Sequence, residues 1–286
     1  MKFTKKLTLL LTTVLLFNCS PKKEHVLQLN GTVLNTDIKS ILLIKPNQDM
    51  RFDSIIEIPV ESGKFHYESK LQYPEAVNLY LGEFKKNRGG RFMPLFLENE
   101  KIVLTIYSEE EFDKNIVNGG KLNGEYREYK KSLDLKFNKR LQPLQDSIST
   151  LGNNHKIISD KMNTFYTELK KVKSQGKKVD IEKQINDLEK EKQLLISKWK
   201  ILDDKIAIIY SEQKIFQQEY MKNRQTMVSY YFLLNDLISY MPIKRIFHTE
   251  TIDVNLAKNT FKILAKAYPK HPYNELVSNL IHTIEN

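Results

Sequence analysis

The feature that most constrains the fold of this chain is a long run of apolar residues spaced alternately three and four positions apart. The run covers Leu141–Val172, pauses at Lys173–Lys178 and resumes over Ile181–Tyr220. This spacing places one apolar stripe along a helix and is typical of a coiled-coil seam. The two arms, each of about 40 residues and about 60 Å, therefore predict a long antiparallel helical hairpin.

Two kinds of residue disturb this pattern. Pro143 and the segment Gly152–Asn154 favour a kink or an interruption in the first arm. Polar residues also occupy seam positions, at His155, Lys192 and Gln213. Because no second ligand type lies at helical spacing beside His155, we interpret these residues as interrupting the seam or setting its register, and not as metal ligands.

Five lysines surround the turn between the two arms: Lys170, Lys171, Lys173, Lys177 and Lys178. Lysines gathered in this way bind an anionic surface at about 1 kcal/mol each near charged lipid. An ordinary solvated turn is the alternative interpretation. These five side chains are the candidate contact with an anionic surface or a partner.

Residues 26–120, which precede the hairpin, have the patterns of β-strands. "HVLQLNGTVL" alternates apolar and polar residues, and "SILLIKP" is a short apolar run ended by proline. "RFDSIIEIPVESGKFHYES" predicts two strands joined in a hairpin at Glu61–Lys64, where Gly63 supplies the left-handed position. "EAVNLYLGEF", "RFMPLFLENE" and "KIVLTIYSE" follow. Short strands about ten residues apart predict an antiparallel β-sandwich-like domain.

Behind the hairpin, three shorter segments predict helices bounded by prolines 242, 269 and 272: Met227–Met241, Ile252–Tyr268 and Tyr273–Ile284. The predicted fold class is therefore α+β. An antiparallel β-sandwich-like domain at 26–120 is followed by the long antiparallel helical hairpin at 121–224 and by a small helical bundle at 225–286.

The single cysteine of the chain, Cys19, lies directly behind an apolar run near the N-terminus. Lysines precede that run, and its length of about eleven residues is typical of a signal-peptide core and too short to span a bilayer. The end of the run, Leu16–Cys19, resembles a bacterial lipobox, with Asn18 in place of the usual small residue. We expect a lipoprotein signal peptide at 1–18, lipidation of Cys19 and a tether at 19–25; a free thiol in an uncleaved anchor is the alternative.

Five short motifs follow one another in a recognisable order, at Leu29–Gly31, Asp53–Ser54, Gly63–Phe65, Phe96–Asn99 and Val117–Asn123. This order resembles the N-terminal domain of unknown function of Bacteroidota lipoproteins, which often stands ahead of a thioredoxin-like (AhpC/TSA or TlpA-like) domain. The resemblance covers residues 26 to about 131 and continues more weakly to the C-terminus.

The resemblance has one important departure. The longer relatives continue into a thioredoxin-like domain with a Trp-Cys-x-x-Cys motif, whose thiolate performs disulfide exchange. This chain ends where that domain would begin, and no cysteine lies near Trp199. The redox activity of the relatives is therefore not expected here.

The sequence contains no established catalytic motif. There is no G-x-S-x-G, no H-E-x-x-H and no nucleotide-binding glycine loop, and the six histidines lie without ligand spacing. The adjacent carboxylates at 203–204 and 109–111 occur in stretches with exposed character. We expect a protein that is not an enzyme, with no cofactor, no metal and no small-molecule substrate.

Charge and the N-terminus indicate the compartment and the partners. The net charge of +10 falls to +7 when the three lysines of the signal peptide are removed. The residues after Cys19 are basic, whereas surface-displayed Bacteroidota lipoproteins usually carry an acidic cluster there. The resemblance thus implies an outer-membrane lipoprotein facing the periplasm, where nucleic acid is scarce and anionic lipid or an acidic protein surface is the expected partner.

The sequence leaves two functional interpretations open. The first is a lipid-anchored, non-enzymatic envelope protein that binds or scaffolds a protein partner through its helical hairpin. The alternative is an accessory of a periplasmic thiol-redox or stress-response system that works with a separate thioredoxin-like protein.

Overall fold

The computed structural model describes residues 26–34, 37–49, 51–84, 89–246 and 252–286. The predicted signal peptide, Cys19 and the tether lie outside the described residues. The chain divides into two compact units, Met1–Gly120 and Lys121–Asn286. In the described part of the chain, no helix has the length and the apolar character needed to cross a membrane.

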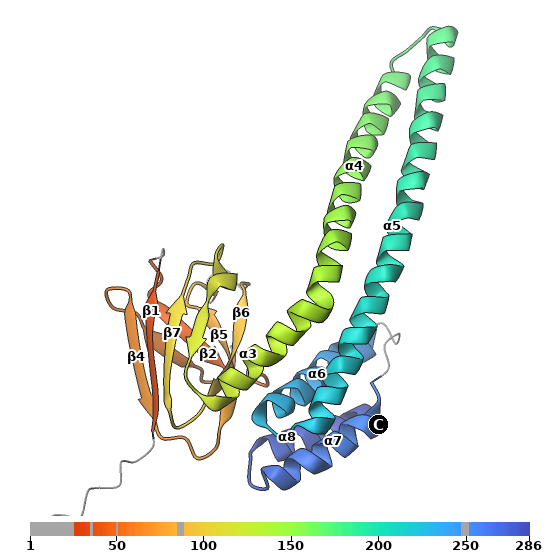
Figure 1. The fold of residues 1–286 in the computed structure, drawn as a ribbon. Coiled ribbons are helices and arrows are strands. Elements are labelled where there is room, and N and C mark those ends of the chain that lie inside the picture. Colours follow the sequence, from red (N-terminus) through yellow and green to blue (C-terminus); the bar gives the residue numbers. More distant parts are fainter. Residues whose placement is uncertain (1–25, 35–36, 50, 85–88, 247–251) are drawn as a thin grey trace, which may run out of the picture. The chain divides into compact units, whose positions relative to one another are not determined.

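The first unit is a sandwich of two four-stranded sheets (Figure 1). One sheet has the strand order β4-β1-β7-β8, formed by Lys64–Ser69, Leu27–Val33, Lys101–Ile106 and Ile116–Asn118. The other has the order β3-β2-β5-β6, formed by Ile56–Pro59, Ser40–Ile44, Glu75–Leu81 and Phe92–Leu97. The predicted α+β class with a β-sandwich-like N-terminal domain is confirmed.

The core of the sandwich consists of alternate residues of the strands. In β1, Leu27 and Leu29 are completely buried and Gln28 between them is not, which is the period-two pattern of a strand with one face on the core. They meet residues of the other sheet, such as Leu79 and Leu95, in one continuous apolar cluster. Burial of this surface, at about 25 cal/mol per Å², is the main stabilising term of the unit.

The predicted hairpin at Glu61–Lys64 is correct as a turn and wrong as a strand pair. Glu61 and Lys64 exchange backbone hydrogen bonds of 2.9 and 3.0 Å, and Ser62 and Gly63 have φ values of 49° and 72°. Beyond this bridge the strands separate, because β3 pairs with β2 and β4 pairs with β1. The turn therefore connects the two sheets. β3 lies in one sheet and β4 in the other, and both contribute apolar residues to the core between them.

The sheets are also not purely antiparallel. β1 pairs with β7 in parallel, over the register Gln28↔Lys101 to Val33↔Ile106. The two strands are far apart in the sequence, so a long connection allows the parallel arrangement that a tight turn forbids.

The second unit is helical. Its elements are α3 (Lys121–Leu133), the π-helical segment η3 (Asp134–Asn138), α4 (Lys139–Leu169), α5 (Gln175–Asn223), α6 (Met227–Ile246), α7 (Val254–Ala267) and α8 (Tyr273–Glu285). α4 and α5 run side by side and are joined at the end of the hairpin, whereas α6, α7 and α8 pack near the other end of α5 (Figure 1). The predicted helical hairpin and small bundle are confirmed.

Two helix predictions need correction. The first arm is not interrupted, because α4 continues as one helix through Pro143 and Gly152. Pro143 removes only one backbone hydrogen bond, and Gly152 packs against Trp199, whose ring lies 3.5 Å from the place of a Cβ. α6 likewise continues past Pro242 to Ile246, so Met241 is not its end.

Candidate functional site

The motifs that carry the family resemblance act in the fold of the sandwich. Gly31 of β1 lies directly opposite Phe65 of β4, and a Cβ on Gly31 would stand 2.0 Å from the Phe65 ring. The ring therefore fills the space over the glycine, and Phe65 is 5% exposed. The strand motif that ends at Gly31 and the Gly63–Phe65 motif form one packing unit.

Two further motifs fix loops of the same unit. The Asn99 side chain accepts a hydrogen bond from the Leu71 N–H and donates one to the Leu71 carbonyl, both at 2.8 Å. Gly119 has a φ of +90°, and a Cβ there would lie 2.2 Å from the Lys101 carbonyl oxygen. The Asn99 contact joins two loops, and the Gly119 approach joins a loop to β7, so these motif residues serve the fold of the sandwich.

The predicted contact residues gather at the end of the hairpin. Three of them lie between α4 and α5 and two lie in the first turn of α5, in the order Lys170, Lys171, Lys173, Lys177 and Lys178. All are exposed except Lys178, which is half-buried. In the described part of the chain, none of the five ammonium groups forms an ion pair. We call these residues the lysine tip.

The lysine tip stands on a packed base. Val172 and Leu169 pack against an apolar cluster formed by Ile158 and Met162 of α4 with Ile181 and Ile185 of α5. The backbone of the loop is held by the bonds Lys171 N–H to Glu168 O at 2.8 Å and Lys178 N–H to Ser174 O at 3.1 Å. The lysines therefore project from an ordered turn and not from a loose linker.

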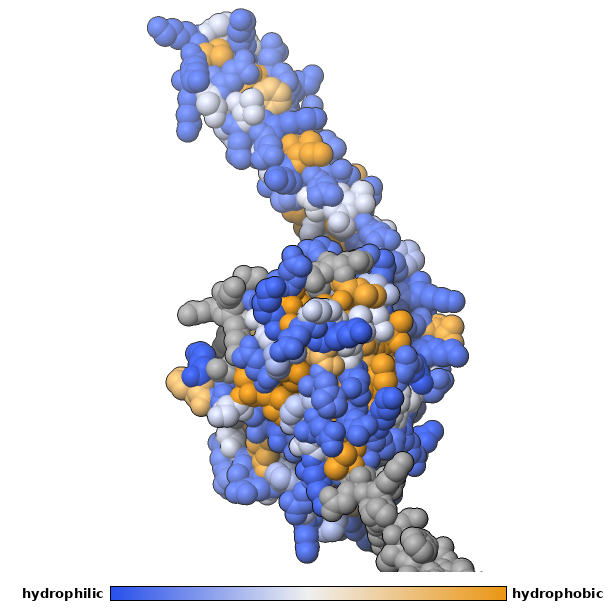
Figure 2. All heavy atoms as spheres, turned by 90° about the vertical axis from the view of Figure 1, so that its left-hand side faces the viewer, coloured by the Kyte–Doolittle hydropathy of each residue, from blue (hydrophilic) through white to orange (hydrophobic). Residues whose placement is uncertain are grey.

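The electrostatics of the lysine tip favour anions. Residues 169–179 contain the five lysines and no acidic residue; the nearest acids along the chain are Glu168 and Asp180. The N-terminus of α5 adds its partial positive charge, because its first turn has no acidic side chain and Ser174 forms no side-chain cap. On the face seen in Figure 2, the hairpin is mostly hydrophilic, with separate apolar patches along its length.

At the other end of the hairpin, an aromatic cluster fixes α5 to its neighbours. The Tyr129 ring of α3 lies 4.7 Å from Phe232 of α6 and 4.8 Å from Tyr220 of α5, measured between ring centroids. Burial raises the pKa of Tyr126, beside this cluster, to about 12. Its hydroxyl stays protonated at neutral pH, and the rings of the cluster pack α3, α5 and α6 together.

A carboxylate supports the same junction. Glu125 of α3 accepts hydrogen bonds from the Tyr220 hydroxyl and, at 2.7 Å, from the Thr226 hydroxyl. Burial and this contact with Glu125 raise the pKa of Tyr220. The base of the hairpin is thus held by both packing and polar contacts.

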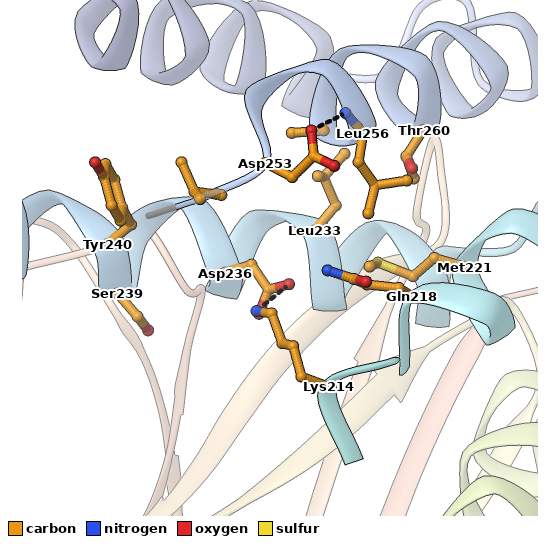
Figure 3. Close-up of a pocket in the computed structure, with 12 residues that line it drawn as sticks. Lys214, Gln218, Met221, Leu233, Asp236, Ser239, Tyr240, Asp253, Leu256 and Thr260 are labelled. Atoms are coloured by element: carbon orange, nitrogen blue, oxygen red, sulfur yellow. Dashed lines mark hydrogen bonds and ion pairs between the residues drawn. The ribbon is translucent and has the colours of Figure 1, made fainter. Parts of the chain in front are cut away.

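A cavity of about 240 Å³ lies among α5, α6 and α7 (Figure 3). Met221, Leu233 and Ala257 contribute apolar walls, and Lys214 and Asp236 lie at its edge with a separation of 2.9 Å. Both oxygens of Asp236 are engaged, one by Lys214 and one by Gln217 at 3.2 Å. The cavity is smaller than the usual 300–1,000 Å³ of ligand pockets. Asp253, which also lines it, accepts the Leu256 N–H at 2.9 Å as the N-cap of α7.

Metal binding finds no support in the described residues, where no three His, Cys, Asp or Glu side chains come together as ligands. His66 bonds Asn30 on an exposed strand at 2.8 Å, and His271 is buried and accepts the Tyr273 N–H at 3.1 Å. His155 is half-buried, on the spacing of the seam.

Comparison with known proteins identifies one domain. Residues 27–126 match the family described as a domain of unknown function (DUF4369). The matched segment contains the whole sandwich and the beginning of α3, which agrees with the predicted extent of 26 to about 131. No curated protein and no solved structure matches the chain.

Sequence reasoning did not identify the cavity, because its lining residues come from three helices and form no motif. The Lys214–Asp236 pair, 22 positions apart, has no spacing that distinguishes it from the many other lysines and acids of the chain. The lysine tip was identified, because its residues are close in sequence and a tight turn keeps them close in space.

Proposed function

We propose that this protein is a lipid-anchored, non-enzymatic protein of the cell envelope that binds or scaffolds a partner through its helical hairpin. The observation that carries the proposal is the lysine tip: five cations with no acidic residue between positions 169 and 179, placed on an ordered turn at the end of a long two-helix arm. The sandwich completes its own core and does not need such an arm for stability.

The anchor is part of the proposal. Cys19 follows an apolar run with the spacing of a lipobox, and the family domain at 27–126 begins shortly after it. A lipidated Cys19 would hold the protein on the outer membrane of a Bacteroidota cell, facing the periplasm. Cys19→Ser should release the protein from the membrane fraction or leave the precursor unprocessed; a processed, membrane-bound variant would refute the anchor.

The binding role is tested by reversing the charge of the lysine tip. The variant changes Lys170, Lys171, Lys173, Lys177 and Lys178 to glutamate. Exposed charges alter the free energy of unfolding by under about 0.5 kcal/mol each, so the variant should fold. It should lose the salt-sensitive binding of the full chain to phosphatidylglycerol vesicles or to native envelope proteins, measured by co-sedimentation at low and physiological salt.

A matched control tests whether binding depends on the position of the charges or only on the net charge of the protein. Five exposed lysines elsewhere in the helical unit are changed to glutamate: Lys121, Lys130, Lys131, Lys262 and Lys266. This control has the same net charge and should retain binding. Equal loss in both variants, or no loss in either, would show that the lysine tip is only a solvated turn.

A further inference from the structure

α5 carries a second apolar row that the hairpin does not use. The row consists of four residues spaced seven apart: Leu194, Ile201, Ile208 and Ile215. Their exposed fractions are 54%, 56%, 59% and 56%, although large aliphatic side chains are usually buried. Over 21 residues the row extends about 31 Å along one side of the helix. We call it the outer row.

The outer row is distinct from the seam between α4 and α5. The seam is formed on α5 by residues such as Ile206 and Ile209, which are 8% and 5% exposed. Ile208 lies between them in sequence and is the most exposed of the outer row, because a step of one or two residues turns the helix by about 100° or 200°. One α5 helix thus presents two apolar lines, of which α4 covers one.

The spacing of the outer row is that of a coiled-coil position. A strict seven-residue repeat keeps side chains on one line only when two helices wind around each other, and isoleucine is favoured at such positions. Polar residues occupy the positions three after each member: Ser197, Asp204, Ser211 and Gln218. A partner helix would therefore meet alternating apolar and polar layers, with Asp204 in the middle.

The flanks of the outer row are basic in its central part. Lys198, Lys200 and Lys205 are exposed, and no ion pair engages them among the residues that the structure describes. Of the other flanking charges, Lys214 is paired with Asp236, Glu212 is paired with Arg140, and Glu191 is exposed. Glu219, which follows Ile215 by four residues, is exposed as well. The charges free for a partner are therefore three lysines and Asp204 along the central part of the row, with Glu191 and Glu219 near its two ends.

From this combination we infer that the outer row is a docking surface for an amphipathic helix of a partner protein with acidic flanks. Acidic residues beside the apolar seam of that helix would face Lys198, Lys200 and Lys205, in the way that charges flanking a seam select coiled-coil partners. The inference names the chemistry of the partner and adds a surface on the shaft of the hairpin to the proposed function.

A second copy of this chain fits the surface less well. In a parallel pair of outer rows, Lys200 of one copy faces Lys205 of the other. In an antiparallel pair centred between Ile201 and Ile208, Lys205 faces its own equivalent. Both arrangements place like charges together, which disfavours self-association.

A membrane surface is a poorer fit as well. Helices that lie in the lipid interface have an apolar face about 100° wide or more, whereas the outer row is one residue wide and Asp204 lies beside its centre. The lysine tip, and not the outer row, has the features expected for contact with anionic lipid.

The test uses two synthetic peptides of four heptads, each with leucine and isoleucine along the seam. One has glutamate at the flanking positions and the other has lysine. Binding of each to the full chain is measured by isothermal calorimetry at low salt. The acidic peptide should bind the wild-type chain, and the basic peptide should bind about tenfold more weakly or not at all.

Four variants locate the binding. Ile201→Glu with Ile208→Glu should abolish binding of the acidic peptide, whereas Ile157→Glu with Ile196→Glu, which alters exposed apolar residues outside the outer row, should not. Lys198→Glu with Lys205→Glu should reverse the preference in favour of the basic peptide. The charge-reversed lysine tip should bind the acidic peptide as the wild type does, so this test can fail independently of the vesicle test.

Other outcomes overturn the inference. If both peptides bound equally, or neither bound, the proposed charge complementarity between the outer row and an acidic helix would be wrong. A dimer of the full chain that Ile201→Glu and Ile208→Glu dissociate would assign the outer row to a second copy. Vesicle binding that the same two changes abolish, with the lysine tip intact, would assign it to the membrane.

Discussion

The sandwich and the hairpin bury their apolar residues in different ways. In the sandwich, two sheets enclose the core, and residues such as Leu29, Leu79 and Leu95 are completely buried. In the hairpin, one helix covers one side of another, and α5 retains side chains such as Ile208 that are more than half exposed. The sandwich encloses its core between two layers and leaves scattered residues such as Phe52 and Phe92 exposed, whereas α5 keeps a regular row of exposed apolar side chains.

The polar contacts differ in the same sense. In the sandwich, Asn99 bonds both backbone groups of Leu71 in a partly buried position. Across the hairpin, the ion pair Arg140–Glu212 and the hydrogen bond of Tyr166 to Glu189 are exposed. Exposed pairs of this kind contribute about 0–1 kcal/mol each, so the hairpin has little besides its seam to stabilise it.

The largest expected effect compares one core substitution in each region. Leu79→Ala removes a completely buried side chain from the sandwich and should lower the free energy of unfolding by about 3–5 kcal/mol. Ile185→Ala removes a buried side chain from the hairpin seam, where two single helices can close over the gap, and should cost about 2 kcal/mol.

Hydrogen exchange measured by mass spectrometry distinguishes these two losses. Leu79→Ala should accelerate exchange throughout the sandwich strands, because they unfold together, whereas Ile185→Ala should accelerate exchange only near the end of the hairpin. Uniform acceleration in both variants would mean that the two regions do not differ in the way described.

A smaller effect concerns the packing of the Phe65 ring on Gly31. Gly31→Ala places a Cβ 2.0 Å from that ring and should cost about 1–3 kcal/mol, measured by urea denaturation. With Phe65→Ala present, the same change should cost much less, because the clash is gone. Additive costs would show that Gly31 is required for another reason.

The smallest effect concerns exposed charges, for which the two regions should be alike. A hydrogen bond from Arg51 lowers the pKa of Asp49 from 3.8 to about 2, and one from Arg140 lowers the pKa of Glu212. A carboxylate whose pKa is lower in the folded protein stabilises the fold only while it is charged. Its contribution to the free energy of unfolding is therefore fully present above the pKa of the unfolded chain. It is lost as the pH falls through the pKa of the folded protein.

For Asp49 that loss should occur between about pH 4 and pH 2. Arg51→Ala should return the pKa of Asp49 toward 3.8 in an NMR titration and change the melting temperature very little. A large change in melting temperature would mean that this surface pair matters to the sandwich core.

The sequence was most informative where one period extends over many residues. The apolar spacing of Ile181–Tyr220 predicted α5, which covers Gln175–Asn223. The three-and-four spacing did not reveal the outer row. Leu194 and Ile201 lie directly beside Leu195 and Leu202, which fit that spacing and were assigned to the seam. The seven-residue repeat that links the members of the outer row is the signal that distinguishes the two lines.

Strand pairing was harder to predict, because it depends on contacts that the local sequence does not contain. The turn at Ser62–Gly63 was recognisable, yet only the core determines that β3 and β4 belong to different sheets. The parallel pairing of β1 with β7 joins segments about 70 residues apart and leaves no local signal. Of the candidate contact surface, the lysine tip could be predicted, since a short turn holds its residues together.

The central claim is that a partner binds the hairpin, at the lysine tip and along the outer row. Hydrogen exchange of the full chain, purified and then in its native envelope, tests this claim most directly. Amides of α5 around Ile201 and Ile208 and those next to the lysine tip should exchange more slowly in the envelope, while those of the sandwich strands stay unchanged. Unchanged exchange along the hairpin, or slowing confined to the sandwich, would contradict the account.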